Sequence, residues 1–217
     1  MLKKLILLVW LAASPAALAA PVIVVLGDSL SSGYGLPAGS GWVALLEARL
    51  RAQGYPHQVV NASVSGETTL GGRNRVTGLL ERHRPDVLIV ALGGNDGLRG
   101  LAPETTRANL AAIIEAAQAR GSRVLLAGIR LPPNYGRPYI EKFQALFPEL
   151  ARRYGVSLVP FLLEGFGERL EFFQADGIHP SASAQTLMLD NVWPALQPLL
   201  GAHPGPRRTS REGMEES

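Results

Sequence analysis

The feature that most restricts the fold of this chain is a regular alternation of short apolar runs with longer helical segments. The apolar runs, rich in Val, Leu and Ile, lie at residues 22–26, 58–61, 87–92, 124–129 and 156–159. Between them, apolar residues recur at the spacing of one helix face. Continuous apolar strands that alternate with helices are typical of a parallel sheet covered on both faces. The sequence therefore predicts a three-layer α/β/α sandwich with a five-stranded parallel sheet.

Five helices are predicted between and after these strands, and several of them end at a glycine or before a proline. They cover residues 42–53, 70–84, 103–120, 139–154 and 182–200. Pro148 falls inside the fourth helix, where a proline removes a backbone hydrogen bond. We therefore expect a kink or an interruption at that point.

The two ends of the chain differ from the predicted domain at residues 20–200. Two lysines precede an apolar run near the N-terminus, and Ala17-Leu18-Ala19 has the small-x-small pattern that a signal peptidase cleaves. We expect residues 1–19 to be a signal peptide cleaved near Ala19, which would make the mature protein periplasmic or secreted. Residues 201–217 combine prolines, glycines and mixed charges without apolar periodicity, which predicts a disordered tail.

Composition excludes several classes of function. The 217 residues include no cysteine, which excludes disulfides, thiolate metal sites and a cysteine nucleophile. Removing Lys3 and Lys4 from the 21 Lys and Arg leaves 19 against 18 Asp and Glu, and no basic stripe contains interleaved aromatics. We therefore expect no nucleic-acid partner. The spacing of His, Asp and Glu predicts no metal site, and no segment after the signal peptide predicts a membrane span. We expect a monomer.

Four short polar blocks recur at defined places in this pattern. They are Gly27-Asp28-Ser29-Leu30, Ser65-Gly66-Glu67-Thr68, Gly93-Gly94-Asn95-Asp96 and Asp176-Gly177-Ile178-His179-Pro180. The first three follow predicted strands. Because ligands bind outside the carboxyl ends of parallel strands, we expect these three blocks to face a common crevice.

The blocks contain the groups that acyl transfer requires. Ser29 is the candidate nucleophile, His179 the candidate base, and Asp176 the acid that would orient it. Gly66 and Asn95 are candidate oxyanion donors, together with the amide of Ser29. Taken alone, Ser29 also fits a helix N-cap and His179 a solvated loop residue, so the assignment depends on all four blocks together.

These blocks resemble those of the SGNH (GDSL) hydrolase family, whose four letters correspond here to Ser29, Gly66, Asn95 and His179. Longer stretches are similar to the subgroup of bacterial periplasmic thioesterase I/protease I/lysophospholipase and arylesterase. These stretches lie at residues 61–66, 92–100 and 129–136.

The resemblance implies a flavodoxin-like sandwich and hydrolysis of esters and thioesters with a broad range of acyl groups. It also implies a mobile loop over the acyl chain at Leu131–Gly136. The substrate-binding candidates in this loop are Leu131, Pro132, Asn134 and Tyr135.

We therefore predict a serine acylhydrolase of arylesterase, acyl-CoA thioesterase or lysophospholipase type that works through an acyl-enzyme and needs no cofactor. Its expected partners are small acyl esters or thioesters. A carbohydrate O-deacetylase is an alternative that the same residues could serve. A non-catalytic glycan- or lipid-binding module is the alternative from another class, which the four intact blocks disfavour.

Overall fold

The computed structural model describes residues 20–201. The predicted signal peptide at residues 1–19 and the predicted tail beyond Gly201 lie outside these residues.

The five predicted strands form one sheet in which every neighbouring pair is parallel. The strands are β1 (Val22–Gly27), β2 (Gln58–Asn61), β3 (Val87–Ala91), β4 (Arg123–Ala127) and β5 (Ser157–Val159). Their order is β2-β1-β3-β4-β5, so the direction of winding changes between β1 and β3. In sheets of this order, ligands bind at the carboxyl ends of the strands where the winding reverses. The predicted α/β/α sandwich is confirmed.

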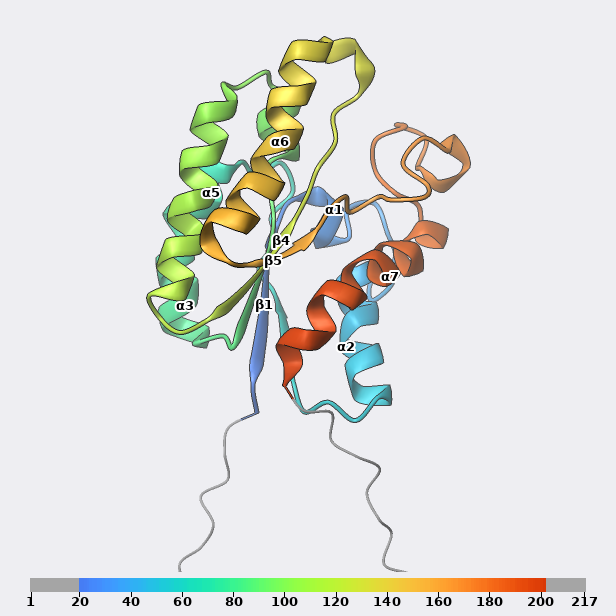
Figure 1. Cartoon of the computed structure of the whole chain (residues 1–217). Coiled ribbons are helices and arrows are strands. Elements are labelled where there is room, and N and C mark those ends of the chain that lie inside the picture. Colours follow the sequence, from blue (N-terminus) through green and yellow to red (C-terminus); the bar gives the residue numbers. More distant parts are fainter. Residues whose placement is uncertain (1–19, 202–217) are drawn as a thin grey trace, which may run out of the picture.

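Helices connect the strands and cover both faces of the sheet. The α-helices are α1 (Ser29–Ser32), α2 (Trp42–Ala52), α3 (Thr69–His83), α4 (Gly94–Leu98), α5 (Pro103–Gln118), α6 (Arg137–Tyr154) and α7 (Gln185–Leu196). Short 3-10 helices are η1 (Pro133–Tyr135), η2 (Leu170–Phe172), η3 (Ala182–Ala184) and η4 (Gln197–Leu200). Figure 1 shows α2 and α7 on one face, and α3, α5 and α6 on the other.

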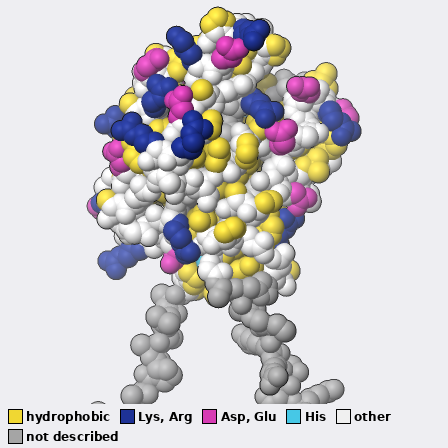
Figure 2. Space-filling model, in the orientation of Figure 1, with side chains coloured by type: hydrophobic (Ala, Val, Ile, Leu, Met, Phe, Trp, Pro, Cys, Tyr) yellow, Lys and Arg dark blue, Asp and Glu magenta, His cyan; other side chains and the backbone are white. Residues whose placement is uncertain are grey.

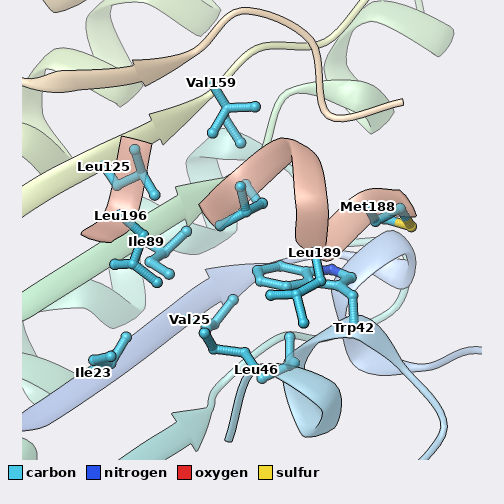
Figure 3. Close-up of a cluster of buried hydrophobic side chains, with 14 of the residues drawn as sticks. Ile23, Val25, Trp42, Leu46, Ile89, Leu125, Val159, Met188, Leu189 and Leu196 are labelled. Carbon is cyan, nitrogen blue, oxygen red and sulfur yellow. The ribbon is translucent and has the colours of Figure 1, made fainter. Parts of the chain in front are cut away.

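Alternating side chains of the central strands enter two separate cores. Ile23 and Val25 of β1 pack under α2 and α7 with Trp42, as Figure 3 shows. Val24 and Leu26 pack on the opposite face under α3, α5 and α6. All four are fully buried, and each such side chain contributes roughly 1.5–3 kcal/mol by leaving water. Burial on both faces explains why the apolar runs are continuous rather than alternating.

Two predicted helices differ from the observed ones. α6 continues through Pro148 without interruption, because the buried residues Phe143, Leu146 and Leu150 hold both of its halves against the sheet. The predicted helix at 182–200 divides instead into η3, α7 and η4. Pro198 lies in η4 and has no amide hydrogen to continue the α-helical pattern. No helix within residues 20–201 is long and apolar enough to cross a membrane.

Candidate active site

Ser29 lies where β1 passes into α1. Gly27 ends the strand, and Asp28 caps the helix by accepting a hydrogen bond from its second amide at 3.0 Å. A β-carbon at Gly27 would come within 2.8 Å of Ser31, so this close turn requires glycine. The turn places Ser29 Oγ at the carboxyl edge of the sheet, 2.9 Å from Nε2 of His179.

Asp176 holds the other side of the His179 ring. Its Oδ2 lies 2.6 Å from His179 Nδ1, and its Oδ1 accepts hydrogen bonds from the amides of His179 and Ile178 at 3.0 and 2.9 Å. These donors, the His179 amide foremost, hold the pKa of Asp176 well below its ordinary value. An ionised Asp176 accepts the Nδ1 proton, which leaves Nε2 as an acceptor facing Ser29.

Gln174 and Tyr34, to which the sequence analysis assigned no role, fix the segment that carries His179. Gln174 Nε2 donates to the carbonyls of Tyr34 and Pro180 at 2.9 and 3.2 Å. The Gln174 amide donates to the His179 carbonyl at 2.7 Å. The Tyr34 and His179 rings lie 4.5 Å apart between centroids. These contacts join the loop after α1 to the segment after β5.

The other two candidate donors, Gly66 and Asn95, lie on the loop after β2 and on α4. Asn95 Nδ2 donates to the Glu67 carbonyl at 3.0 Å and to Asp28 Oδ2 at 3.3 Å. Gly66 has a φ of 78°, the left-handed conformation that glycine adopts most readily. The contacts of Asn95 therefore hold the loop that contains Gly66 beside Asp28, the residue before Ser29.

Two further contacts hold the same loop. Ser65 Oγ lies 2.9 Å from Ser32 Oγ on α1, and Arg99 Nη2 donates to the Gly66 carbonyl at 3.1 Å. The loop is therefore tied to α1 on one side and to the end of α4 on the other.

Both N–H groups of the Asn95 carboxamide already have acceptors, because Nδ2 carries two hydrogens. An oxyanion bound by Asn95 would have to replace one of these acceptors. The 3.3 Å contact with Asp28 is the longer of the two and is the one that a stronger acceptor would displace.

Asp28 is a buried carboxyl group for which the sequence analysis found no function. Its side chain lies at the switch between β1 and β3, and the residue is only 2% exposed. Burial raises the pKa of Asp28 to about 6, although hydrogen bonds from the Leu30 amide and from Asn95, and the charge of His179, act against this rise. A carboxyl group directly before the serine, at the end of a buried strand, is the sequence signal for such a residue.

Asp96, next to Asn95, is a second carboxyl group with no expected role, and it is fully buried. Asp96 Oδ2 accepts from the Thr69 amide at 2.8 Å, and Oδ1 accepts from the hydroxyls of Thr69 and Thr106. Asn109 Nδ2 completes the network on Thr69 Oγ1 at 3.1 Å. The network fastens α4 to the first turn of α3, and therefore orients Asn95 relative to the Gly66 loop.

The four substrate-binding candidates lie around η1. Leu131 is only 7% exposed, and its side chain packs so closely on Gly97 that a β-carbon there would clash with it. Pro132 and Asn134 are exposed. Tyr135 is half-buried and donates through its hydroxyl to the Leu98 carbonyl at 2.9 Å. Their part in binding an acyl group stays a prediction.

Within residues 20–201, no group of three or more His, Asp or Glu side chains is arranged to hold a metal ion. The arrangement instead offers a hydroxyl, an imidazole and a carboxylate in series, with amide donors held nearby. These are the groups of a serine-dependent acyl transfer.

Comparison with known proteins identifies close similarities over most of the chain. Residues 25–187 match the model of the GDSL-like Lipase/Acylhydrolase family. The chain is 50% identical over 182 residues to the esterase TesA of Pseudomonas aeruginosa, covering 84% of this chain and 90% of that protein. It is 44% identical over 184 residues to thioesterase 1/protease 1/lysophospholipase L1 of Escherichia coli, covering 85% of this chain and 87% of that protein.

A solved structure is also similar. The psychrotrophic esterase EstA from Pseudoalteromonas, inhibited by monoethylphosphonate, superposes with a TM-score of 0.79 at 34% identity. The match covers 83% of this chain and 99% of that one.

Proposed function

The chain belongs to the GDSL-like lipase/acylhydrolase family, and we propose that it is a serine hydrolase that cleaves carboxylic esters and thioesters through an acyl-enzyme on Ser29. The observation that carries this proposal is the hydrogen-bonded series from Ser29 Oγ through the His179 ring to Asp176. The names of the relatives, an esterase and a thioesterase/lysophospholipase, support the same reaction class.

The first half of the reaction acylates Ser29. His179 Nε2 takes the hydroxyl proton as Ser29 Oγ bonds to the acyl carbon, and the carbonyl oxygen becomes an oxyanion. The intermediate then collapses, and the bond to the leaving alcohol or thiol breaks. His179 returns the proton to that leaving group.

The second half releases the acid. Water loses a proton to His179 Nε2 and attacks the acyl carbon, and the second tetrahedral intermediate expels Ser29 Oγ, which recovers the proton. Asp176 stays ionised throughout, because its hydrogen bonds depress its pKa. It stabilises the imidazolium that forms in each half.

The oxyanion would accept hydrogen bonds from the amides of Ser29 and Gly66 and from the carboxamide of Asn95. In this proposal Asn95 exchanges its long contact with Asp28 for the oxyanion and keeps its 3.0 Å bond to the Glu67 carbonyl. Because this bond is kept, Asn95 needs little reorganisation when charge develops on the substrate, which favours catalysis.

The finer parts of the proposal come from the sequence. Residues 131–135 would contact the acyl group, and the segment at residues 1–19 would export the protein to the periplasm or the medium before it is removed. The 44% identity to thioesterase 1/protease 1/lysophospholipase L1 of Escherichia coli supports thioesters and lysophospholipids among the substrates.

Replacement of Ser29 by alanine tests the nucleophile. Hydrolysis of p-nitrophenyl butyrate should fall about 10⁶-fold, as expected for loss of a nucleophile that acts with its base as a unit. Labelling by an organophosphonate should disappear as well.

The matched control is Ser183→Ala, which removes a hydroxyl that lies 2.8 Å from Ser181 Oγ, whereas the His179 ring bonds to Ser29 and Asp176. This variant should keep both activity and labelling. A folded Ser29→Ala protein that still turns over the ester, or a phosphonate found on another residue, would contradict the assignment.

A further inference from the structure

Large exposed hydrophobic side chains are concentrated at one edge of this molecule. Among the described residues they are Tyr34, Val64, Leu70, Leu98, Leu101, Leu170, Ile178 and Leu187. Every one lies on a segment that follows the carboxyl end of a strand, or in the first turn of a helix that begins there. The segments at the amino edge (residues 53–57, 84–86, 119–122, 155–156 and 197–201) contribute none. Scattered exposed apolar residues are normal in proteins, but confinement to one edge is not.

Six of these side chains flank the residues proposed for catalysis, and we call them the apolar rim. The apolar rim consists of Tyr34, Val64, Leu70, Leu98, Leu101 and Ile178. Four separate segments contribute to it: the loop after α1, the region from β2 into α3, α4 with the loop after it, and the segment after β5.

The contacts of the site place these segments around Ser29. The Tyr34 ring lies against the His179 ring, whose Nε2 is 2.9 Å from Ser29 Oγ. Val64 precedes Ser65, whose hydroxyl is 2.9 Å from Ser32 on the helix that begins with Ser29. These contacts place Tyr34 and the loop of Val64 beside the proposed nucleophile, and Ile178 directly precedes His179 in the sequence.

No other described element covers the apolar rim. The described chain begins before β1 and ends after η4, so both of its ends lie at the amino edge, the lower edge in Figure 1. The six side chains are between 37% and 54% exposed.

One cation stands next to the apolar rim without an acidic partner. Arg99 is exposed, it donates to the Gly66 carbonyl, and none of the ion pairs between described residues includes it. By contrast, Arg130 and Arg169 at the same edge pair with acids. The guanidinium has further donors that could bind a phosphate. Figure 2 shows basic and acidic side chains interspersed on the face in view.

We propose that the carboxyl edge docks on the surface of a phospholipid aggregate, with the apolar rim among the acyl chains and Arg99 on a headgroup phosphate. The exposed apolar side chains come from four separate segments at this edge rather than from one loop. A second copy seated on the apolar rim would close the entrance to Ser29. A lipid surface would remove the exposed side chains of the apolar rim from water and would also present acyl esters to the site. The inference rests on the proposed function, since it assigns the site a substrate held in such a surface.

Vesicle binding by the full chain tests the proposal. Wild type should co-sediment with sucrose-loaded vesicles of phosphatidylcholine and phosphatidylglycerol. Val64→Ser/Leu98→Ser should bind them about tenfold more weakly, because two exposed apolar side chains are lost from the contact. The same variant should hydrolyse micellar lysophosphatidylcholine more slowly, while its rate on soluble p-nitrophenyl butyrate should match wild type.

Two controls match these changes. Leu187→Ser alters an exposed leucine on α7, outside the apolar rim, and should not change vesicle binding. Arg99→Gln should weaken vesicle binding about threefold, whereas Arg82→Gln on the last turn of α3 should not.

Three results would overturn the proposal. The first is a wild-type protein that hydrolyses p-nitrophenyl butyrate but does not bind vesicles, which would leave the proposed function intact. The second is a double variant whose rate falls as much on monomeric dodecanoyl-CoA as on micellar lysophosphatidylcholine, which would make the apolar rim an acyl-chain site. The third is a wild-type dimer in sedimentation that the double variant abolishes, which would make it a contact between copies of this chain.

Discussion

The two edges of the sheet carry different chemistry, although the same strands and helices reach both. At the carboxyl edge, Ser29, His179 and Asp176 form a hydrogen-bonded series surrounded by exposed apolar side chains. Among the described residues, the amino edge has no exposed large hydrophobic side chain and carries six exposed arginines. They are Arg82, Arg84, Arg120, Arg123, Arg152 and Arg153.

The direction of the helices explains this difference. In a parallel α/β fold the helices run against the strands, so their C-termini collect at the amino edge. The partial negative charge of helix C-termini favours cations, and Arg82 and Arg152 lie in the last turns of α3 and α6. The basic amino edge is therefore accounted for by helix stability, whereas the apolar carboxyl edge needs another explanation.

A hollow of about 390 Å³ lies at the amino edge rather than near Ser29. It is lined by Leu80, Glu81, Arg84, Arg120 and Ser122. Arg120 and Glu81 pair across it at 3.1 Å, and its lining includes no base beside a nucleophile. The comparison of the edges therefore favours the reactive groups, and not the presence of a hollow, as the mark of the proposed functional edge.

The largest expected difference between the edges comes from removing one hydrogen-bonding side chain at each. Asn95→Ala should lower kcat on p-nitrophenyl butyrate about 10²–10³-fold, because it removes a proposed oxyanion donor. Ser122→Ala at the amino edge removes a buried hydroxyl that donates to the Pro85 carbonyl at 2.6 Å. It should cost about 1 kcal/mol in the free energy of unfolding and leave kcat unchanged.

Steady-state kinetics and urea unfolding on both variants provide the check. If Ser122→Ala lowered kcat as strongly as Asn95→Ala, the two edges would not be functionally separate.

The next effect is a difference in how the two edges respond to pH. Burial raises the pKa of Asp28 to about 6 from 3.8, so the folded state binds a proton more tightly than the unfolded state. The free energy of unfolding should therefore fall as pH rises from about 4 to about 6, by at most about 3 kcal/mol from this group. Asp28→Asn should lose this decline in urea unfolding measured at several pH values.

His57 at the amino edge serves as the opposite control. Burial lowers the pKa of His57, so the folded state binds this proton less tightly than the unfolded state does. The contribution of neutral His57 to the free energy of unfolding is therefore complete above the unfolded pKa and is lost as pH falls below about 6.5. His57→Gln should therefore change the pH slope of stability in the opposite direction from Asp28→Asn. Identical slopes for wild type and Asp28→Asn would show that Asp28 does not titrate in this range.

The smallest effect concerns the backbone at the amino edge. Arg84 caps the end of α3 with a φ of 43°, the left-handed region that costs a side chain about 1–2 kcal/mol. Arg84→Gly relieves this cost, but glycine loses roughly 0.5–1 kcal/mol more entropy on folding. We expect a net gain of about 0.5 kcal/mol in urea unfolding and no change in kcat. A loss of stability would show that the arginine side chain matters more than the backbone.

Much of the fold could be predicted because it depends on local patterns. The apolar runs at β1 and β3 are continuous because both faces of these strands are buried, and every predicted strand is present. The four polar blocks were also visible, since three of them follow strand ends. Pro148 shows the limit of local rules, because packing of Phe143 and Leu150 keeps α6 continuous where a proline alone can interrupt a helix.

Residues such as Asp28 and Asp96 could not be interpreted from local pattern. Each lies inside a recognised block, but its effect depends on donors from other segments: the Asn95 carboxamide for Asp28, and Thr69 for Asp96. Even the Asn95 donors, expected to be available, already have acceptors in the structure.

The sequence by itself determined the strands, the helices between them and the types of reactive group at their ends, because hydrophobic period and turn chemistry act over a few residues. The tertiary structure decided the strand order, the 2.9 Å approach of two side chains 150 positions apart, and which carboxyl groups are buried. Those properties depend on atoms that become neighbours only when the chain folds, and burial of a charge has no local signature.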